Sequence, residues 1–200
     1  MQKPYEYSYE LRVGVTSGSL IDLETTGRNP FGDEIITFGY IEGHTLRIVQ
    51  RRRKEKEQAF LNRLKPALEV LPQPFYAYSA DFERDFIKAK FRIRAKFVDL
   101  MKPWKRKAER TLCLSCKGKG VVLDGICEHC QGWGRLKWPK LGELISEPGK
   151  YFGEEVIQGR DVPTLWDRYC KTKKLKYLLL IIQHCQIDLL RELILLIHFV

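Results

Sequence analysis

The sequence predicts an α/β fold. Short apolar runs bounded by turn residues alternate with stretches whose apolar residues recur at helical spacing. Three strands, a helix, a strand, a helix, a strand and then further helices form an order that is typical of this class. The 200 residues, 44% of them hydrophobic, are enough for one sizeable core and a small extra module.

Strands are expected where apolar runs end at Gly, Pro or acidic residues. The second and third strands meet at Glu42-Gly43, which predicts a hairpin turn. A proline break precedes the fourth strand, which is short. The expected strands are 17–27, 33–43, 44–52, 74–79 and 94–101.

Helices are expected where apolar residues recur every three or four positions, as Phe60, Leu64 and Leu68 do. Asp81 is a candidate N-cap for the second helix, and Pro163 suits the first turn of a later one. The expected helices are 55–70, 81–91, 140–146, 162–172 and 175–200.

The last of these segments is strongly apolar, but it also carries Gln183, Asp188, Arg191 and Glu192. A membrane span would not carry that polar load, so a buried helix is expected and no membrane contact. Its apolar end, LILLIHFV, is expected either to pack inside or to form an oligomer or partner contact. The opening residues contain no apolar signal segment, which favours a cytoplasmic protein.

The formal net charge is +10, which favours a polyanionic partner, with nucleic acid, either DNA or RNA, the leading candidate. A basic surface without a specific partner is the alternative.

Asp22 and Glu24 end an apolar run in the stretch SLIDLETTG. Residues i and i+2 of a strand point to the same face, so the two carboxylates would repel one another unless a cation balances them. Oxygen-only ligands suit Mg²⁺ or Mn²⁺. The pair therefore predicts a divalent metal site at the end of this strand.

The segment IDLETTG resembles the first motif of the DEDD 3′–5′ exonucleases, whose RNase H-like fold is a mixed sheet flanked by helices. The family's second motif is an Asn, two residues and then Phe-Asp, at the start of a helix. On YAYSADFERDF this pattern places Ser79 at the Asn and Glu83 at the Asp. Glu83 is preferred as the metal ligand over its neighbours Asp81 and Asp85, and a solvated helix face is the alternative for all three.

The third motif of that family is an acid on a late helix, preceded by a Tyr or His that acts on water. Asp188 would be the acid, and His184 stands four residues before it, on the same helix face. The spacing is that of the tyrosine branch and the residue is that of the histidine branch, which leaves the identity of the base open. A histidine satisfied within a helix interface is the alternative.

The segment GRDVPTLWDRY also resembles one found in the predicted exonuclease branch of the YprB type. These resemblances imply hydrolysis of phosphodiester bonds with two Mg²⁺ or Mn²⁺ ions, held by Asp22, Glu24, Glu83 and Asp188. His184 would position or deprotonate the attacking water.

Two CxxCxGxG repeats supply the pairs Cys113/Cys116 and Cys127/Cys130, with ten residues between the pairs. Four thiolates at this spacing suit one structural Zn²⁺, and the repeats resemble the zinc domains of DnaJ-type proteins. A redox-active site would need one CxxC pair, not two. The other two cysteines, Cys170 and Cys185, are expected in the core.

The residues around this cluster carry nine positive and three negative side chains between Trp104 and Lys140. We expect an inserted zinc module over 105–137 and an RNase H-like exonuclease domain formed by 1–104 and 138–200. Two other functions stay open. One is a catalytically degenerate nucleic-acid-binding protein that uses its zinc module, and the other is a structure-selective endonuclease.

Overall fold

The computed structural model describes residues 5–123, 125–137, 139–146 and 157–199. Its centre is a six-stranded mixed sheet with the strand order β1-β4-β3-β2-β5-β6. Strands β1 to β4 pair antiparallel, whereas β5 and β6 run parallel to β2. The strands are β1 Glu6–Glu10, β2 Ser19–Thr25, β3 Ile35–Glu42, β4 Thr45–Gln50, β5 Phe75–Ala77 and β6 Phe97–Asp99.

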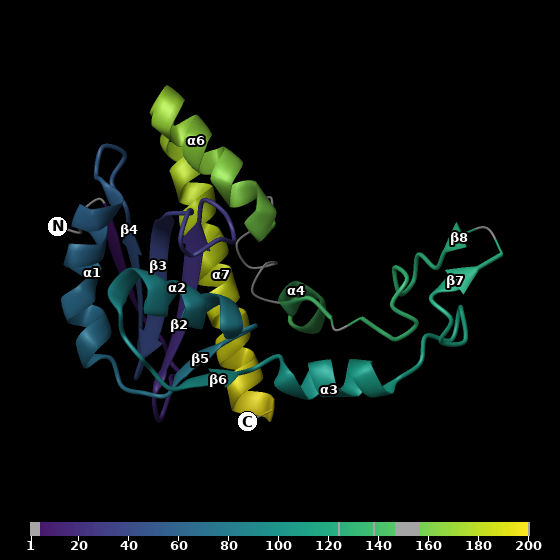
Figure 1. Cartoon of the computed structure of the whole chain (residues 1–200). Helices are drawn as coiled ribbons and strands as arrows, with labels where there is room; N and C mark the ends of the chain where they lie inside the picture. The colour runs from purple at the N-terminus through teal and green to yellow at the C-terminus, as the bar shows by residue number, and fades with distance from the viewer. Residues whose placement is uncertain (1–4, 124, 138, 147–156, 200) are drawn as a thin grey trace.

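Helices cover both faces of this sheet, so the fold has three layers (Figure 1). Helices α1 and α2 pack on one face, and α7 runs along the other with α6 beside it. The helices are α1 Glu57–Val70, α2 Asp81–Phe91, α3 Lys102–Arg110, α4 Leu141–Leu144, α6 Val162–Thr172 and α7 Leu175–Phe199, with a 3-10 turn η1 at Gly159–Asp161. The mixed α/β fold predicted from the sequence is therefore confirmed.

The cysteine-bearing segment extends away from the sheet (Figure 1). It contains α3 and a second sheet of only two short strands, β7 Val121–Val122 and β8 Gly125–Ile126. The large apolar side chains on these two strands are exposed, and the buried apolar cluster of the segment consists of the four cysteines. This segment therefore has almost no apolar core of its own.

Strand β2 lies inside the sheet between β3 and β5, and its side chains alternate between the two faces. Leu20 belongs to the core under α7, whereas Ile21 and Leu23 belong to the core under α1 and α2. Asp22 and Glu24 share the parity of Leu20, so both face α7. The alternation of side chains along β2 thus places Asp22 and Glu24 on the face of the sheet that α7 covers.

A glycine allows α7 to approach β2 closely. Gly39 of β3 pairs with Asp22, and a Cβ atom on Gly39 would lie 2.4 Å from the Cys185 Sγ and 2.7 Å from a Leu189 methyl. Any larger residue here would push α7 off the sheet. The glycine therefore sets the distance between the acids of β2 and the polar residues of α7.

Three local features differ from the sequence-based expectation. Ala80, not Asp81, is the N-cap of α2, because the chain already turns into helical geometry at Ala80, and the side chain of Asp81 pairs instead with Arg84 three residues later. Strand β1 was not expected, since EYSYE is a short, half-exposed edge strand without an apolar run. Helix α3 was not expected either, because its nine residues are mostly basic.

The apolar C-terminal segment forms α7, and Val200 lies outside the described residues. Leu189, Leu193 and Leu195 are buried, which corresponds to the inside-packing alternative, while Ile197 is half-exposed. Within the part of the chain that the structure describes, no helix has both the length and the apolar character that a membrane crossing requires.

We predict that Gly39→Ala lowers the free energy of unfolding by about 2 kcal/mol, because the new methyl group overpacks the contact with α7. Urea unfolding of the zinc-loaded chain measures this. The double variant Gly39→Ala/Cys185→Ala should recover part of the loss, since the nearest obstructing atom is the Cys185 sulfur. Purely additive effects of the two substitutions would contradict this account of the contact.

Candidate active site

Acids from three elements meet at a cavity of about 470 Å³. Asp22 and Glu24 come from β2, Glu83 from α2, and Asp188 from α7. His184 of α7 lines the same cavity. The five residues that the sequence singled out, four acids as metal ligands and His184 for the attacking water, thus line one cavity, although β2 and α7 lie near opposite ends of the chain.

Several carboxylate oxygens here are enclosed without a partner. Among the described residues, Asp22 Oδ2, Glu83 Oε2 and Glu192 Oε2 are buried and make no hydrogen bond. A buried polar atom without a partner is costly, and more so when it is charged. These three oxygens therefore indicate where a cation would be stabilised.

Burial and neighbouring negative charges raise the pKa values of the acids in this cavity. Burial, and then the negative charge of Asp188, raises the pKa of Asp22 to about 7. Burial also raises the pKa of Glu24 and of Glu83, and the charge of Asp22 adds to both effects. Each of these carboxylates is held near others that disfavour its ionised form.

His184 is placed between two of the acids. Its Nε2 atom lies 3.6 Å from Glu24 Oε1 and 3.6 Å from Asp188 Oδ2, which is longer than an ordinary hydrogen bond. Its other nitrogen, Nδ1, is buried and has no hydrogen-bond partner among the described residues. The imidazole is 8% exposed, so it is held in the cavity wall with one nitrogen toward the acids.

Asp188 has a cationic neighbour that the sequence reading missed. The Arg191 Nη1 donates to Asp188 Oδ1 at 2.8 Å, and the Arg191 Nε donates to the Ile145 carbonyl at 2.9 Å. Arg191 is itself buried. The only sequence signal was the i, i+3 spacing from Asp188, which is common on helices.

A further acid, Glu192, was also missed. It is 2% exposed, and its Oε1 accepts the Tyr78 backbone N–H at 2.6 Å. Burial, and then the charges of Asp22 and Glu83, raises its pKa. Glu192 stands one helical turn after Asp188, a spacing that places both on the side of α7 toward the sheet. Glu192 is therefore close enough to Asp22 and Glu83 to be affected by their charges, and its carboxylate also binds the backbone just after β5.

The segment that resembles the second motif of the DEDD exonucleases has a defined local geometry. Ser79 adopts a φ of 68°, in the left-handed region that Asn tolerates better than most residues. Ser79 stands where that motif of the DEDD exonucleases has Asn. Glu83 is buried in the cavity wall, while Asp81 and Asp85 are exposed and pair with Arg84 at 2.8 and 3.4 Å. The structure thus separates Glu83 from its two acidic neighbours.

The donor set suits a hard divalent cation, because it consists of carboxylate oxygens, two of which, on Asp22 and Glu83, have no hydrogen-bond partner. The acids are more widely spread than the thiols of the cysteine segment. Among the residues that the structure describes, only the four cysteines bring three or more ligand atoms within 4.8 Å of one another. Repulsion between like charges opposes a tighter acid cluster.

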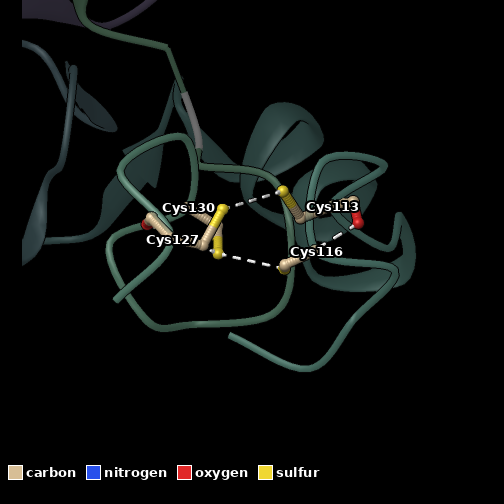
Figure 2. Close-up of side chains that lie close together, drawn as sticks. All are labelled: Cys113, Cys116, Cys127 and Cys130. Atoms are coloured by element: carbon tan, nitrogen blue, oxygen red, sulfur yellow. Dashed lines mark hydrogen bonds between the residues drawn. The ribbon is translucent and has the colours of Figure 1, made fainter. Parts of the chain in front are cut away.

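The four cysteines form a compact buried cluster (Figure 2). The sulfurs of Cys113 and Cys127 lie 3.9 Å apart, and those of Cys116 and Cys130 lie 3.6 Å apart. Zn–S bonds of about 2.3 Å place the sulfurs of a regular tetrahedron about 3.8 Å apart. The cluster therefore fits zinc in both ligand type and spacing.

The two repeats of this cluster support one another reciprocally. The Cys113 N–H donates to the Gly134 carbonyl and the Cys127 N–H donates to the Gly120 carbonyl, both at 3.0 Å. Gly120 and Gly134 also direct their own N–H groups at the sulfurs of Cys116 and Cys130, at 3.3 and 3.2 Å. A Cβ at either glycine would collide with the opposite repeat, and both have positive φ, so these glycines are required.

Comparison with known proteins places the chain in a family. The family model described as the RNase H superfamily matches residues 20–121, just over half of the 200 residues. The chain belongs to the RNase H superfamily. The matched region contains Asp22, Glu24 and Glu83. No match was found among curated proteins.

Two solved structures resemble the chain. One is a family B DNA polymerase from the hyperthermophilic archaeon Pyrobaculum calidifontis, with a TM-score of 0.45, 14% identity, and coverage of 89% of this chain and 23% of the polymerase. The other is a product-bound exonuclease I, with a TM-score of 0.37, 13% identity, and coverage of 82% of this chain and 46% of that one. The chain thus spans less than half the length of either protein.

We predict that stability falls with rising pH because of Asp22. The folded-state pKa of Asp22 is about 7, above the ordinary value of about 4, so the folded state binds more protons between these values. Asp22→Asn should therefore gain about 2 kcal/mol over wild type between about pH 5.5 and about pH 8. Urea unfolding of the zinc-loaded chain, without other divalent cations, measures the difference.

Asp85→Asn is the control for that experiment, because it removes an exposed acid of the same region. It should follow the pH dependence of wild type. If Asp22→Asn also runs parallel to wild type across this range, Asp22 is not held in the crowded environment described here.

We predict one zinc ion per chain at the cysteine cluster. Cys127→Ser should lose the zinc, since one of four ligands is gone, yet leave the six-stranded sheet folded. Metal analysis of protein purified without chelator, beside far-ultraviolet circular dichroism, measures both. Cys170→Ser, on α6 and outside the cluster, is the matched control and should keep its zinc. A folded wild-type chain free of zinc would contradict the assignment.

Proposed function

We propose that this chain is a metal-dependent nuclease, specifically a 3′–5′ exonuclease that hydrolyses phosphodiester bonds of single-stranded DNA or RNA. The observation that carries the proposal is one cavity lined by four acids, two of which, Asp22 and Glu83, each have a buried carboxylate oxygen without a hydrogen-bond partner. Membership of the RNase H superfamily supports it, as does the net charge of +10, which favours a polyanionic substrate.

Asp22, Glu24, Glu83 and Asp188 would hold Mg²⁺ or Mn²⁺, two ions per site. When bound, such ions supply positive charge against the attacking and leaving oxygens of a phosphodiester. Glu192 supports this group from behind: it fixes the Tyr78 backbone and so the start of the segment that carries Glu83. The longer Glu83 reaches the cavity from α2, where the family pattern has an Asp.

His184 is the residue that we assign to the attacking water. An imidazole nitrogen in the cavity wall would accept a proton from a water molecule or orient it through a hydrogen bond. Glu24 and Asp188 lie on either side of its Nε2 and stabilise the imidazolium that results. Arg28 and Arg160 line the same cavity, are exposed, and would bind the phosphate oxygens of the strand.

The division into domains is part of the same proposal. Residues 1–104 and 138–200 would form the exonuclease domain, and residues 105–137 the inserted zinc module, whose bound zinc would be structural. The way the cysteine segment extends from the sheet supports this division (Figure 1). We further assign the chain to the YprB-type branch, on the strength of the segment that forms η1 and α6.

The ion pair between Asp188 and Arg191 favours a second candidate, a binding protein without catalytic activity. The 2.8 Å contact occupies one oxygen of Asp188 with a buried cation of the chain itself. In that case nucleic acid would bind while the acids held no catalytic metal. Direct measurement of cleavage separates the two candidates.

We predict that Glu83→Gln reduces Mn²⁺-dependent cleavage of an end-labelled single strand by at least about 100-fold, because it removes a charge on which metal binding depends. Asp85→Asn is the matched control: it changes an exposed acid two residues away and should retain wild-type activity. A gel assay with DNA and RNA strands of the same sequence provides the measurement.

A circular single strand is included in that assay. An exonuclease leaves it intact, whereas degradation of the circle would identify an endonuclease instead. Mn²⁺ binding by calorimetry without any cleavage would favour the binding protein. Equal loss of activity in Glu83→Gln and Asp85→Asn would contradict the site as described.

A further inference from the structure

A second cavity, of about 680 Å³, adjoins the acid cavity. The two share Arg28, Tyr78 and Gly159 in their walls, so they are contiguous. The second cavity is bordered on its other side by the cysteine segment, through Gln131, Trp133 and Lys137. Its volume lies within the range of ordinary ligand sites.

The charge changes sign between the two cavities. The described residues that line the second cavity include three cations, Arg28, Lys137 and Lys140, and no acid. The three cations are exposed to solvent and accessible to a ligand. A polyanion that reached the acid cavity would therefore meet positive charge as it left in this direction.

Trp133 adds an aromatic surface to this cationic cavity. The residue is 64% exposed, although tryptophan is largely buried in most folds. The buried apolar cluster of the cysteine segment consists of the four cysteines, and the exposed Trp133 lies outside it. An exposed indole beside lysines is the combination that single-stranded nucleic acids bind, with bases stacked and phosphates neutralised.

Tyr78 forms part of the wall that the two cavities share. Its backbone N–H is bound by Glu192 of α7, and its hydroxyl donates to the Pro139 carbonyl, where the cysteine segment returns to the sheet. The wall that the cavities share is thus fixed from both sides. A strand lying across Tyr78 would contact both the acid site and the cysteine segment.

We propose that this second cavity is a subsite for single-stranded nucleic acid, in which one base stacks on Trp133 while Lys137, Lys140 and Arg28 contact phosphates. The role of the subsite rests on the proposed nuclease function, because it holds the strand whose end enters the acid cavity. The cysteine segment is then a part of the substrate site as well as a folded module. A single strand fits better than a duplex, since its bases are free to stack on a side chain.

The test measures binding of a fluorescein-labelled oligothymidylate to the zinc-loaded full chain, without added divalent cation, so that it does not depend on cleavage. Trp133→Ala should weaken binding about tenfold, and Trp133→Phe should restore most of the loss. Lys137→Gln/Lys140→Gln should flatten the slope of log affinity against log salt by about 1.4, at about 0.7 for each lost phosphate contact.

The matched control is Lys107→Gln/Lys119→Gln, which removes two exposed charges from the same segment outside this cavity. It should change the slope much less. An equal change in both pairs, or wild-type affinity in Trp133→Ala with zinc retained, would overturn the subsite. Polyglutamate should displace the strand poorly, and efficient displacement would overturn nucleic acid as the occupant in favour of an acidic protein.

Cleavage is measured separately, and the two proposals can fail independently. If all variants bind the strand as wild type does and the chain cleaves with Mn²⁺, the subsite proposal is wrong and the nuclease proposal stands. If the variants show the expected binding defects but the chain cleaves no strand, the nuclease proposal is wrong and the cavity is a binding surface for single strands.

Discussion

Five carboxylates, Asp22, Glu24, Glu83, Asp188 and Glu192, are concentrated where β2, α2 and α7 meet, and they are largely withdrawn from water. Burial and the repulsion of neighbouring carboxylates raise the pKa of Asp22 to about 7 and also raise the pKa of Glu24, Glu83 and Glu192. Arg191 is the one buried cation that contacts them directly among the described residues. The rest of the domain is arranged around this unfavourable cluster, which a divalent cation would relieve.

The scaffold brings the acids together through backbone geometry more than through side-chain chemistry. The alternation of β2 points two acids at α7, and Gly39 on the neighbouring strand lets the helix come close enough to complete the site. The rigid sheet stabilises an arrangement that the acids alone would not adopt. In the acid site the folded sheet holds the ligands in place, whereas in the cysteine segment the metal would hold the fold together. The segment has almost no apolar core, so a bound metal would supply most of its folding energy.

Much of the fold and site could be predicted from the sequence, because the signals were local. Asp22 and Glu24 follow from period-two alternation in one strand, and the four cysteines from their spacing. Glu192 and Arg191 carried no such signal. Their role depends on which side of α7 faces the sheet. Because α7 is apolar on several sides, its sequence pattern does not identify which of these sides is buried. Strand β1 is an edge strand that pairing with β4 creates, and local propensity did not indicate it.

An anomalous-scattering map from crystals of the full chain soaked in Mn²⁺ tests the central claim most directly. Mn²⁺ peaks are expected within bonding distance of Asp22 and its neighbouring carboxylates, between β2 and α7, and a separate zinc peak is expected among the four cysteine sulfurs. Soaking with an uncleavable strand present covers the case in which substrate completes the site. A map with no Mn²⁺ at these acids, with the strand bound, would contradict the central claim.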